Sequence, residues 1–336
     1  MRIFDLRAAL ALAALGFLNS GGALAETATT DSGGFIGVGG SAALGVPTPA
    51  HKAPFWSLSG EPELRSSSVV IYDPSDGAVL YERDADTVVP IASITKLMTA
   101  LVVRDGEQPL DEMIEITAAD RDTLRGTGSR LPIGARLSRG DLLHLALMSS
   151  ENRAANALGR AYPGGLAMFV QVMNAKAKAL GMKTARFVEP TGLSSGNVSS
   201  AADLVKLVLA ASRDPLIREY SVDPSHTVTV RGQPMEFRNS NLLVEKDDWE
   251  IALQKTGFTS DAGRCLVMSA YIQERPVVMV LMNSVGKYTR IADARRVRQW
   301  MEQPGERTQY ASTSTQPGTR TVSMQGEAAG VMTASP

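Results

Sequence analysis

The chain has 336 residues, of which 44% are hydrophobic and 21% are charged, and its formal net charge is −1. This is an ordinary globular composition, long enough for one large domain or two small ones. The balanced charge, without a long block of lysine and arginine, argues against a nucleic-acid-binding protein.

The first 25 residues have the pattern of a secretory signal peptide. Arg2 and Arg7 precede an apolar run at 8–18, and Ala23-Leu24-Ala25 fits an A-x-A cleavage site, so cleavage is predicted after Ala25. The apolar run is too short to span a bilayer, and no later stretch is long enough. We therefore expect an exported protein with no membrane anchor after cleavage, located in a bacterial periplasm or outside the cell.

The rest of the chain divides into three parts. Residues 26–60 are rich in Gly, Ser, Ala and Pro and are typical of a flexible leader. Residues 303–336 are polar and poor in large apolar side chains, which predicts a disordered tail. A core domain is expected at about 61–302.

The core begins with two strand-like runs, "SSVVIYD" and "AVLYERD", which a Pro74–Gly77 turn signal joins into a predicted hairpin. A helix is expected near Ser93, and the part from about 138 to 215 is mainly helical. Ser138 with Asp141, and Ser199 or Ser200, have the pattern of helix caps.

After residue 225 the sequence returns to strands and ends in one helix. The strand-like runs are "HTVTVRG", "EIALQKTGF", "RCLVMSAYI" and "RPVVMVLMNS", and the helix is "RIADARRVRQWM". Its four arginines between Arg290 and Arg298 are expected on the solvated side. The order predicts an α/β (α+β) fold, with one antiparallel sheet from both chain ends and a helical subdomain inserted between them.

Cysteine and histidine give no sign of a metal or redox centre. Cys265 is the only cysteine, so no intrachain disulfide can form, and its apolar run predicts a buried structural thiol. His51, His144 and His226 are scattered, and His144 in "DLLHLALM" is expected to be a core histidine. No metal site and no cofactor are predicted.

Ser93 and Lys96 in "PIASITKLMTALVV" (90–103) stand one helical turn apart at a predicted helix start. Side chains at i and i+3 share a face, and free N–H groups at a helix start favour an alkoxide or oxyanion. Alone, the segment favours the simpler interpretation, in which Ser93 only caps the helix and Lys96 is solvated. The same S-x-x-K spacing recurs at Ser284 and Lys287.

Two further motifs change that interpretation. Ser150-Glu151-Asn152 ends a predicted helix, and Lys255-Thr256-Gly257 lies on a predicted strand. Each has an imitation, at 195–197 and 183–185, but S-x-x-K, S-x-N and K-T-G in this order on these elements rarely arise by chance. The triple is known from penicillin-binding proteins and class A β-lactamases.

The residue types suit nucleophilic catalysis. A serine hydroxyl needs a base, and with no histidine in position the base is Lys96, whose pKa burial and the charge of Lys255 would lower. Ser150 is then a candidate proton relay to the leaving amine, and Asn152 a candidate to hold the substrate amide while bonding to Lys96.

The K-T-G strand suits substrate binding. Lys255 and the Thr256 hydroxyl suit a carboxylate, and Gly257 lets a substrate backbone lie close to the strand. The N–H groups of Ser93 and Phe258 are candidate oxyanion donors.

With these motifs in view, the chain resembles the low-molecular-mass penicillin-binding proteins of the D-alanyl-D-alanine carboxypeptidase/endopeptidase family, peptidase family S11, over about 62–302. The stretches at 189–204, 237–243 and 255–268 also resemble that family. The resemblance implies the serine β-lactamase/DD-peptidase fold, acyl transfer from D-Ala-D-X peptides of peptidoglycan to Ser93, hydrolysis of the acyl-enzyme, and inhibition by β-lactams.

Within the family, "SSEN" with Glu151 resembles the endopeptidase branch of the penicillin-binding protein 7 type. The tail is too short for the extra domain of many carboxypeptidases and has no basic amphipathic face. An endopeptidase acting on D-Ala–meso-diaminopimelate cross-links is therefore favoured over a carboxypeptidase. Less favoured are a β-lactamase, for which Glu189 is the tempting water-positioning residue, and a non-catalytic penicillin-binding sensor.

Overall fold

The structure is a computed structural model and describes residues 60–303. The predicted signal peptide and almost all of the predicted leader and tail lie outside these residues. The helices and strands are η1 (Ala92–Ile94), η2 (Ala118–Asp120), α1 (Thr95–Asp105), α2 (Arg139–Met148), α3 (Asn152–Arg160), α4 (Gly165–Ala179), α5 (Ala201–Ala211), α6 (Pro215–Val222), α7 (Thr289–Glu302), β1 (Ser66–Asp73), β2 (Ala78–Arg83), β3 (Val89–Pro90), β4 (Met113–Glu115), β5 (Arg136–Ser138), β6 (Val198–Ser199), β7 (Ser225–Val230), β8 (Gln233–Arg238), β9 (Glu250–Thr259), β10 (Gly263–Ile272) and β11 (Arg275–Ser284).

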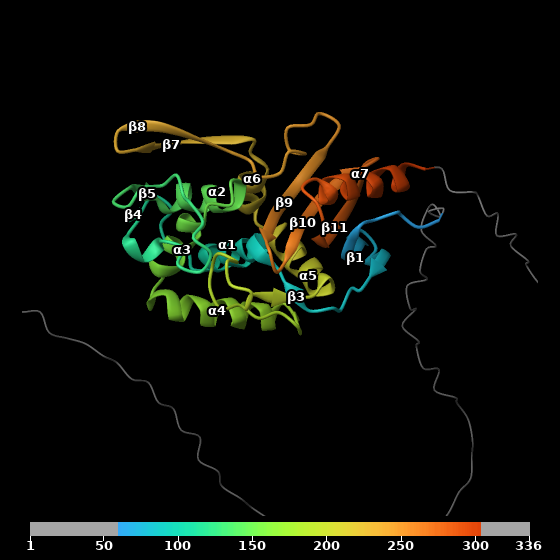
Figure 1. Cartoon of the computed structure of the whole chain (residues 1–336), viewed down its shortest axis with the longest axis horizontal. Helices are drawn as coiled ribbons and strands as arrows, with labels where there is room; N and C mark the ends of the chain where they lie inside the picture. The colour runs from blue at the N-terminus through green and yellow to red at the C-terminus, as the bar shows by residue number, and fades with distance from the viewer. Residues whose placement is uncertain (1–59, 304–336) are drawn as a thin grey trace, which may run out of the picture. The chain divides into compact units, whose positions relative to one another are not determined.

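A five-stranded antiparallel sheet joins the two ends of the described chain. Its strand order is β2-β1-β11-β10-β9, so the first strand pairs with the last, with Val70 opposite Val280. The helices between β2 and β9 lie beside this sheet in Figure 1. The predicted sheet from both chain ends, with inserted helices, is confirmed.

The sheet is buried on both faces, which explains the nearly continuous apolar runs in β10 and β11. Alternate residues point to opposite faces of a strand. Thus Leu266 and Met268 pack in the core under α7, whereas Cys265 and Val267 pack in the larger core shared with the helical region.

Two of the predicted helix caps are present. The hydroxyl of Ser138 accepts the amide N–H of Asp141 at the start of α2, and Ser200 accepts that of Asp203 at the start of α5. Each bond satisfies one of the N–H groups left unpaired by a helix start. In a full capping box the Asp141 carboxylate would accept the backbone N–H of Ser138. Here the carboxylate accepts the Ser138 hydroxyl instead.

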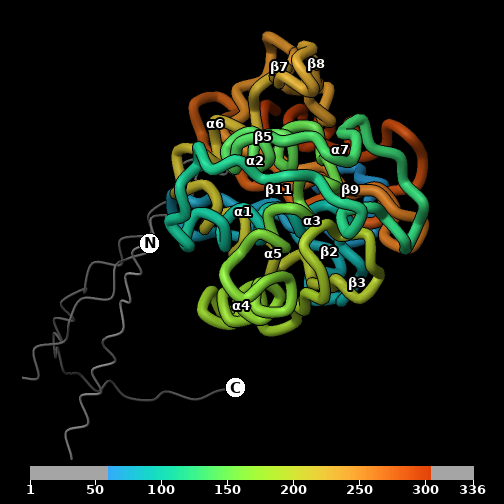
Figure 2. The backbone as a smooth tube through the Cα atoms, turned by 90° about the vertical axis from the view of Figure 1, so that its left-hand side faces the viewer, coloured from blue at the N-terminus to red at the C-terminus, as the bar shows by residue number. Residues whose placement is uncertain are grey.

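One predicted strand does not join the central sheet. β7 pairs only with β8, which the sequence pattern does not predict, and the hairpin stands at the top of Figure 2. Arg231 and Gly232 join the two strands with φ of 51° and 77°. Two positive φ values form the tight turn that matches strand twist, so a local hairpin replaces the expected sheet extension.

The prediction for the last helix is wrong at one residue. Arg290 is only 8% exposed and lies in the first turn of α7, whereas Arg295 faces solvent. Within residues 60–303, no helix is long and apolar enough to cross a membrane.

Candidate active site

The serine and lysine of the first motif are in direct contact. Ser93 lies in η1, a single turn immediately before α1, and its Oγ accepts a hydrogen bond from Lys96 Nζ at 2.9 Å. The expected capping role of Ser93 is wrong, because Ile94 is the N-cap of α1 and makes no side-chain cap. The hydroxyl of Ser93 is therefore directed to the lysine rather than to the helix backbone.

The turn that carries Ser93 is tightly held. Ala92 has a φ of 47°, which is rare for a side chain with a Cβ and marks stored backbone strain. Gly192 and Gly257 pack against it: a Cβ on Gly192 would lie 1.9 Å from the Ala92 carbonyl oxygen, and one on Gly257 would lie 3.2 Å from the Ser93 nitrogen. Only glycine leaves room for this turn at position 192.

Lys96 is fully enclosed by acceptors. Besides Ser93, its Nζ donates to Asn152 Oδ1 and to the Thr191 carbonyl, each at 2.7 Å. A neutral amine has two N–H groups and one lone pair. If the two N–H groups serve Asn152 and Thr191, the lone pair faces Ser93 and can accept its proton. The contacts therefore suit a general base.

The surroundings of Lys96 also make its neutral form easier to reach than in a solvated lysine. Burial lowers its pKa to about 8, while the carboxylates of Glu189 and Glu151 oppose that fall. The predicted effect of burial on the pKa of Lys96 is confirmed, but the predicted contribution from the charge of Lys255 is not among its causes. It is Lys96 whose charge lowers the pKa of Lys255.

The S-x-N motif lies between two helices, as expected. Ser150 follows α2 with a φ of 64°, Glu151 is the N-cap of α3, and Asn152 begins that helix. The amide of Asn152 is oriented by two contacts, since its Nδ2 donates to Thr127 Oγ1 at 3.1 Å while its Oδ1 accepts from Lys96. Among the described residues, the Ser150 hydroxyl has no hydrogen-bond partner.

The K-T-G motif lies on β9, an edge strand of the sheet. Lys255 is completely buried and donates to the Thr256 carbonyl at 3.0 Å. Burial, with the charges of Lys96 and Arg290, lowers the pKa of Lys255 well below its usual value. Thr256 Oγ1 lies 2.7 Å from Ser240 Oγ, which fixes the threonine hydroxyl at the edge.

Phe258 follows this motif near the C-terminal end of β9. Its side chain is 56% exposed, and the guanidinium of Arg264 lies over its ring at 4.2 Å. Arg290 acts on Lys255, and Arg264, opposite Phe258, acts on Arg290. This end of the sheet edge is therefore rich in positive charge, which suits an anionic group of a ligand.

The sequence patterns miss three participants. The backbone carbonyl of Thr191 and the hydroxyl of Thr127 have no motif that marks them, because their roles come from contacts across the fold. Arg290 is predicted on a solvated face, yet its Nε and Nη1 are buried and have no hydrogen-bond partner among residues 60–303. The only available signal is its place near the start of a helix that follows a core strand.

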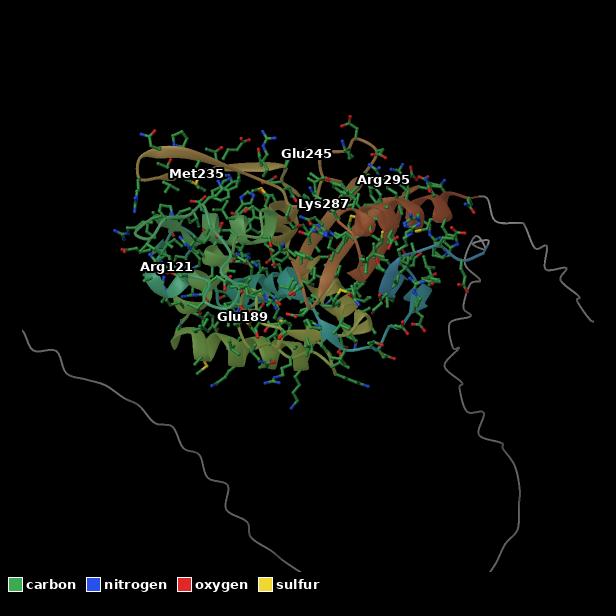
Figure 3. The ribbon with its side chains drawn as sticks, viewed as in Figure 1. Arg121, Glu189, Met235, Glu245, Lys287 and Arg295 are labelled. Atoms are coloured by element: carbon green, nitrogen blue, oxygen red, sulfur yellow. The ribbon has the colours of Figure 1, made fainter. Side chains whose placement is uncertain are left out.

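Glu189 does not have the environment of a water-positioning base. Its carboxylate accepts the N–H groups of Thr191, Gly192 and Ser194, the Thr191 hydroxyl, and the Asn197 amide. Figure 3 labels it below the middle of the described part. Glu189 is therefore the acceptor that holds a tight turn together. The turn also forms one wall of a cavity of about 210 Å³ that Asn152 and the loop 119–124 complete.

The remaining candidates behave as structural groups. Cys265 is buried, as expected, and burial raises its pKa to about 11, so the sulfur stays a thiol. The second S-x-x-K does not form a pair: Ser284 Oγ lies 2.6 Å from Ser66 Oγ, and Lys287 lies over the ring of Tyr288. Within residues 60–303, no group of three His, Cys, Asp or Glu side chains could hold a metal.

Comparison with known proteins agrees with this geometry. The D-alanyl-D-alanine carboxypeptidase family matches residues 57–286. A D-alanyl-D-alanine endopeptidase of Pseudomonas aeruginosa is 49% identical over 264 residues, which cover 78% of this chain and 85% of the relative. An Escherichia coli protein of the same description is 47% identical over 259 residues, covering 76% and 84%.

More distant matches share the fold. The D-alanyl-D-alanine carboxypeptidase DacA of Escherichia coli is 28% identical over 253 residues, covering 72% of this chain and 62% of the relative. The crystal structure of the Streptomyces K15 DD-transpeptidase superposes with a TM-score of 0.67 at 25% identity, covering 72% and 98%.

Proposed function

This chain belongs to the D-alanyl-D-alanine carboxypeptidase family of serine peptidases, and from that membership we propose that it is an endopeptidase of peptidoglycan. The substrate is the D-Ala–meso-diaminopimelate cross-link between two peptide stems, and the reaction passes through an acyl-enzyme on Ser93. The observation that carries the proposal is the 2.9 Å contact between Ser93 Oγ and the buried amine of Lys96.

Acylation begins with the transfer of the Ser93 proton to the lone pair of Lys96. The serine oxygen then attacks the D-Ala carbonyl carbon, and the N–H groups of Ser93 and Phe258 stabilise the oxyanion that forms. When the tetrahedral intermediate collapses, the C–N bond breaks, and Ser150 gives its proton to the leaving amine while it takes one from Lys96. Neutral Lys96 then accepts a proton from water as the water oxygen attacks the ester, and this proton passes to Ser93 Oγ as the acid is released.

The cationic edge of the sheet selects the substrate. In a cross-link, as in D-Ala-D-Ala, a carboxylate is attached to the carbon next to the scissile nitrogen. We assign that carboxylate to Lys255, the Thr256 hydroxyl and Arg290. The assignment of Arg290 rests on its buried guanidinium, which has unpartnered nitrogens beside Lys255. Asn152 holds the substrate amide, and Gly257 leaves room for its backbone.

Three other functions are less well supported. A carboxypeptidase uses the same residues and differs only in the leaving group, and relatives of that description are 28–32% identical rather than 47–49%. A β-lactamase needs a free glutamate, but the carboxylate of Glu189 is saturated by its own turn. A non-catalytic sensor would also need an acylatable serine beside Lys96, so turnover of muropeptides, and not labelling by penicillin, separates it from the enzyme. The pattern of residues 1–25 supports a periplasmic location.

Digestion of purified muropeptides tests this proposal. We expect cross-linked dimers to be converted to monomers, with Ser93→Ala abolishing both turnover and labelling by fluorescent penicillin. Ser284→Ala, which alters the serine of the second S-x-x-K, is the matched control and should retain both. Removal of terminal D-Ala without cleavage of dimers would instead indicate a carboxypeptidase. If the protein is labelled by penicillin but neither cleaves dimers nor removes terminal D-Ala, the proposed enzymatic function is refuted.

A further inference from the structure

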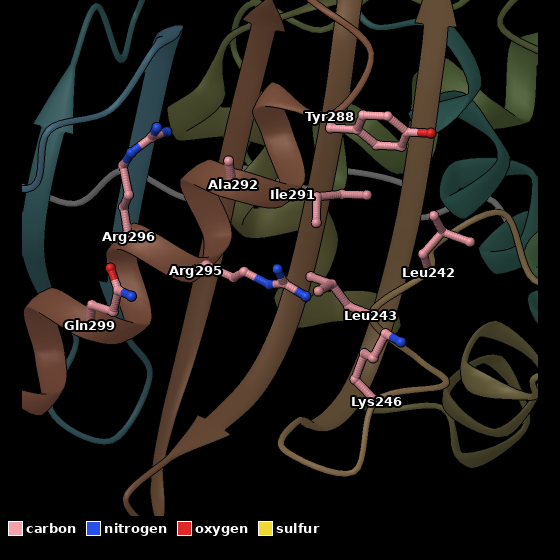
Figure 4. Close-up of a pocket in the computed structure, with 9 residues that line it drawn as sticks. All are labelled: Leu242, Leu243, Lys246, Tyr288, Ile291, Ala292, Arg295, Arg296 and Gln299. Atoms are coloured by element: carbon pink, nitrogen blue, oxygen red, sulfur yellow. The ribbon is translucent and has the colours of Figure 1, made fainter.

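A second cavity, of about 430 Å³, lies between α7 and the loop after Ser240 (Figure 4). We call it the α7 cavity. Its walls include the apolar side chains of Leu242, Leu243 and Ile291 and the cations Lys246 and Arg295. This size is typical of ligand pockets, and the catalytic residues do not line the cavity.

One wall of the α7 cavity begins at the K-T-G motif. Thr256 is opposite Leu266, which packs in the core under α7, whereas Lys255 is opposite Val267, which packs in the helical core. Cross-strand partners point to the same face, so the side chain of Thr256 faces the α7 side of the sheet. It bonds to Ser240, two residues before Leu242 of the cavity wall.

The wall formed by the start of α7 is also close to the active site in sequence. Tyr288 lines the cavity, is 56% exposed, and precedes by two residues Arg290, whose charge lowers the pKa of Lys255. Figure 4 shows Tyr288 in the upper part of the view, Leu242 near mid-height and Lys246 below both. A ligand that enters beside Thr256 can therefore continue between Tyr288 and Leu242 toward the far cations.

The cations of the cavity are available to a ligand. Lys246 and Arg295 are exposed and form no ion pair with any described residue, whereas Arg296 is bound to Asp293. Glu245 belongs to the same loop as Lys246 and is labelled near Arg295 in Figure 3, but it does not line the cavity. An apolar floor with two unpaired cations is complementary to a peptide that carries carboxylates.

We propose that the α7 cavity binds the stem peptide on the amine side of a cross-link, with Lys246 and Arg295 holding carboxylates of that peptide. This inference rests on the proposed endopeptidase function. A carboxypeptidase releases a single D-alanine, which ends at the carboxylate held near Thr256 and never reaches the cavity. A cross-link continues beyond that point as a second acidic stem. The cavity therefore distinguishes the two kinds of leaving group.

The double variant Lys246→Gln/Arg295→Gln tests the proposal in the full enzyme. We expect kcat/KM for a purified cross-linked dimer to fall about fivefold to tenfold, mainly through KM, because two exposed charge contacts are lost. Acylation by penicillin should be unchanged, as should any removal of D-Ala from a monomeric pentapeptide. The double variant Lys178→Gln/Arg218→Gln, which removes two exposed cations from α4 and α6, is the control and should behave as the wild type.

Two results would overturn the inference: an unchanged kcat/KM for the dimer, or an equal loss in penicillin acylation, which would mean damage to the active site itself. Failure of the proposed function is separate, because the wild type would then open no dimers. In that case the dimer is titrated calorimetrically into Ser93→Ala enzyme with and without the two cavity substitutions. Weaker binding in the substituted protein supports the cavity, and equal binding refutes it.

Discussion

Lys96 is the residue on which the proposed chemistry depends. Its three contacts, to Ser93, Asn152 and the Thr191 carbonyl, match the two donors and one lone pair of a neutral amine. Burial lowers its pKa to about 8, and the two nearby carboxylates limit how far it falls. Burial and the two negative charges therefore act on Lys96 in opposite directions, and together they keep its pKa within reach of neutral pH.

This balance predicts the pH dependence of acylation. With a pKa of about 8, only about a tenth of the enzyme holds neutral Lys96 at pH 7, so the rate of penicillin acylation should rise with pH through about 8. The carboxylate of Glu151 raises the pKa, so Glu151→Gln should move the rising limb to lower pH. The rate at pH 7 should then increase, by at most about tenfold.

Stopped-flow acylation between pH 5.5 and 9.5 measures this limb. Glu151→Asp keeps the negative charge and is the control, with a profile close to that of the wild type. A limb that moves to higher pH in Glu151→Gln would show that another group governs acylation.

The motif residues were predictable one by one, whereas their supports were not. Ser93, Lys96, Asn152 and Thr256 belong to short patterns whose order is distinctive, and the structure brings Ser93, Lys96 and Asn152 into contact. The Thr191 carbonyl had no signature, because every residue has a carbonyl. Such contacts are determined by packing between distant segments.

At the scale of elements, the site is assembled from turns rather than from helices. Ala92 precedes Ser93, the proposed nucleophile, with a φ of 47°, and Ser150 separates α2 from α3 with a φ of 64°. Strain of this kind persists only where neighbouring structure holds it. The segment at 189–194 provides that support for η1, through the glycine that lies against the Ala92 carbonyl.

A single methyl group at Gly192 should therefore disable the enzyme. Gly192→Ala places a Cβ within 1.9 Å of backbone, at a φ of +85°, and η1 must move. We expect loss of penicillin labelling and a fall in unfolding free energy of more than about 2 kcal/mol. Gly181→Ala is the matched control, since it has a φ of +71° with open space around it. That variant should lose about 1 kcal/mol and label normally. Normal labelling of Gly192→Ala would refute the account of η1.

The elements that the sequence predicted best were those with a strong local signal. Caps at Ser138 and Ser200, and long apolar strands such as β10 and β11, follow from local rules. The two-residue pair of β3 with β6 is too short to have a periodicity. Strand β7 has strand character but no local sign of its partner, so its place outside the sheet depended on the turn at Arg231 and Gly232.

The histidines show what only the whole molecule determines. They are scattered in the sequence, yet His144 of α2 and His226 of β7 stack with ring centroids 4.0 Å apart, and Tyr220 of α6 stacks on His144 at 4.1 Å. His144 is buried, as predicted, and its Nε2 lies 2.9 Å from Asp223 Oδ2. His226 Nε2 forms a hydrogen bond with Asp141 Oδ1 of α2 at 2.9 Å. The cluster joins the β7–β8 hairpin to the helices that lead to Ser150.

This cluster should make the fold sensitive to mild acid. Burial, together with the nearby His226, lowers the pKa of His144 to about 4, although Asp223 and Asp141 oppose the fall. The unfolded chain protonates this histidine near pH 6.5, whereas the fold holds it neutral. The contribution of neutral His144 to the unfolding free energy is therefore fully present above pH 6.5 and is lost as the pH falls toward 4.

We expect His144 to account for about 2 kcal/mol of the unfolding free energy lost between pH 7 and pH 5. Urea unfolding of the wild type and of His144→Gln at both pH values isolates this share, because glutamine does not titrate. The loss in His144→Gln should be smaller by that amount. His226→Gln should give an intermediate loss, since removing a neighbouring positive charge makes protonation of His144 easier while its burial remains. Equal losses in all three proteins would mean that the stacked histidines do not control the acid stability.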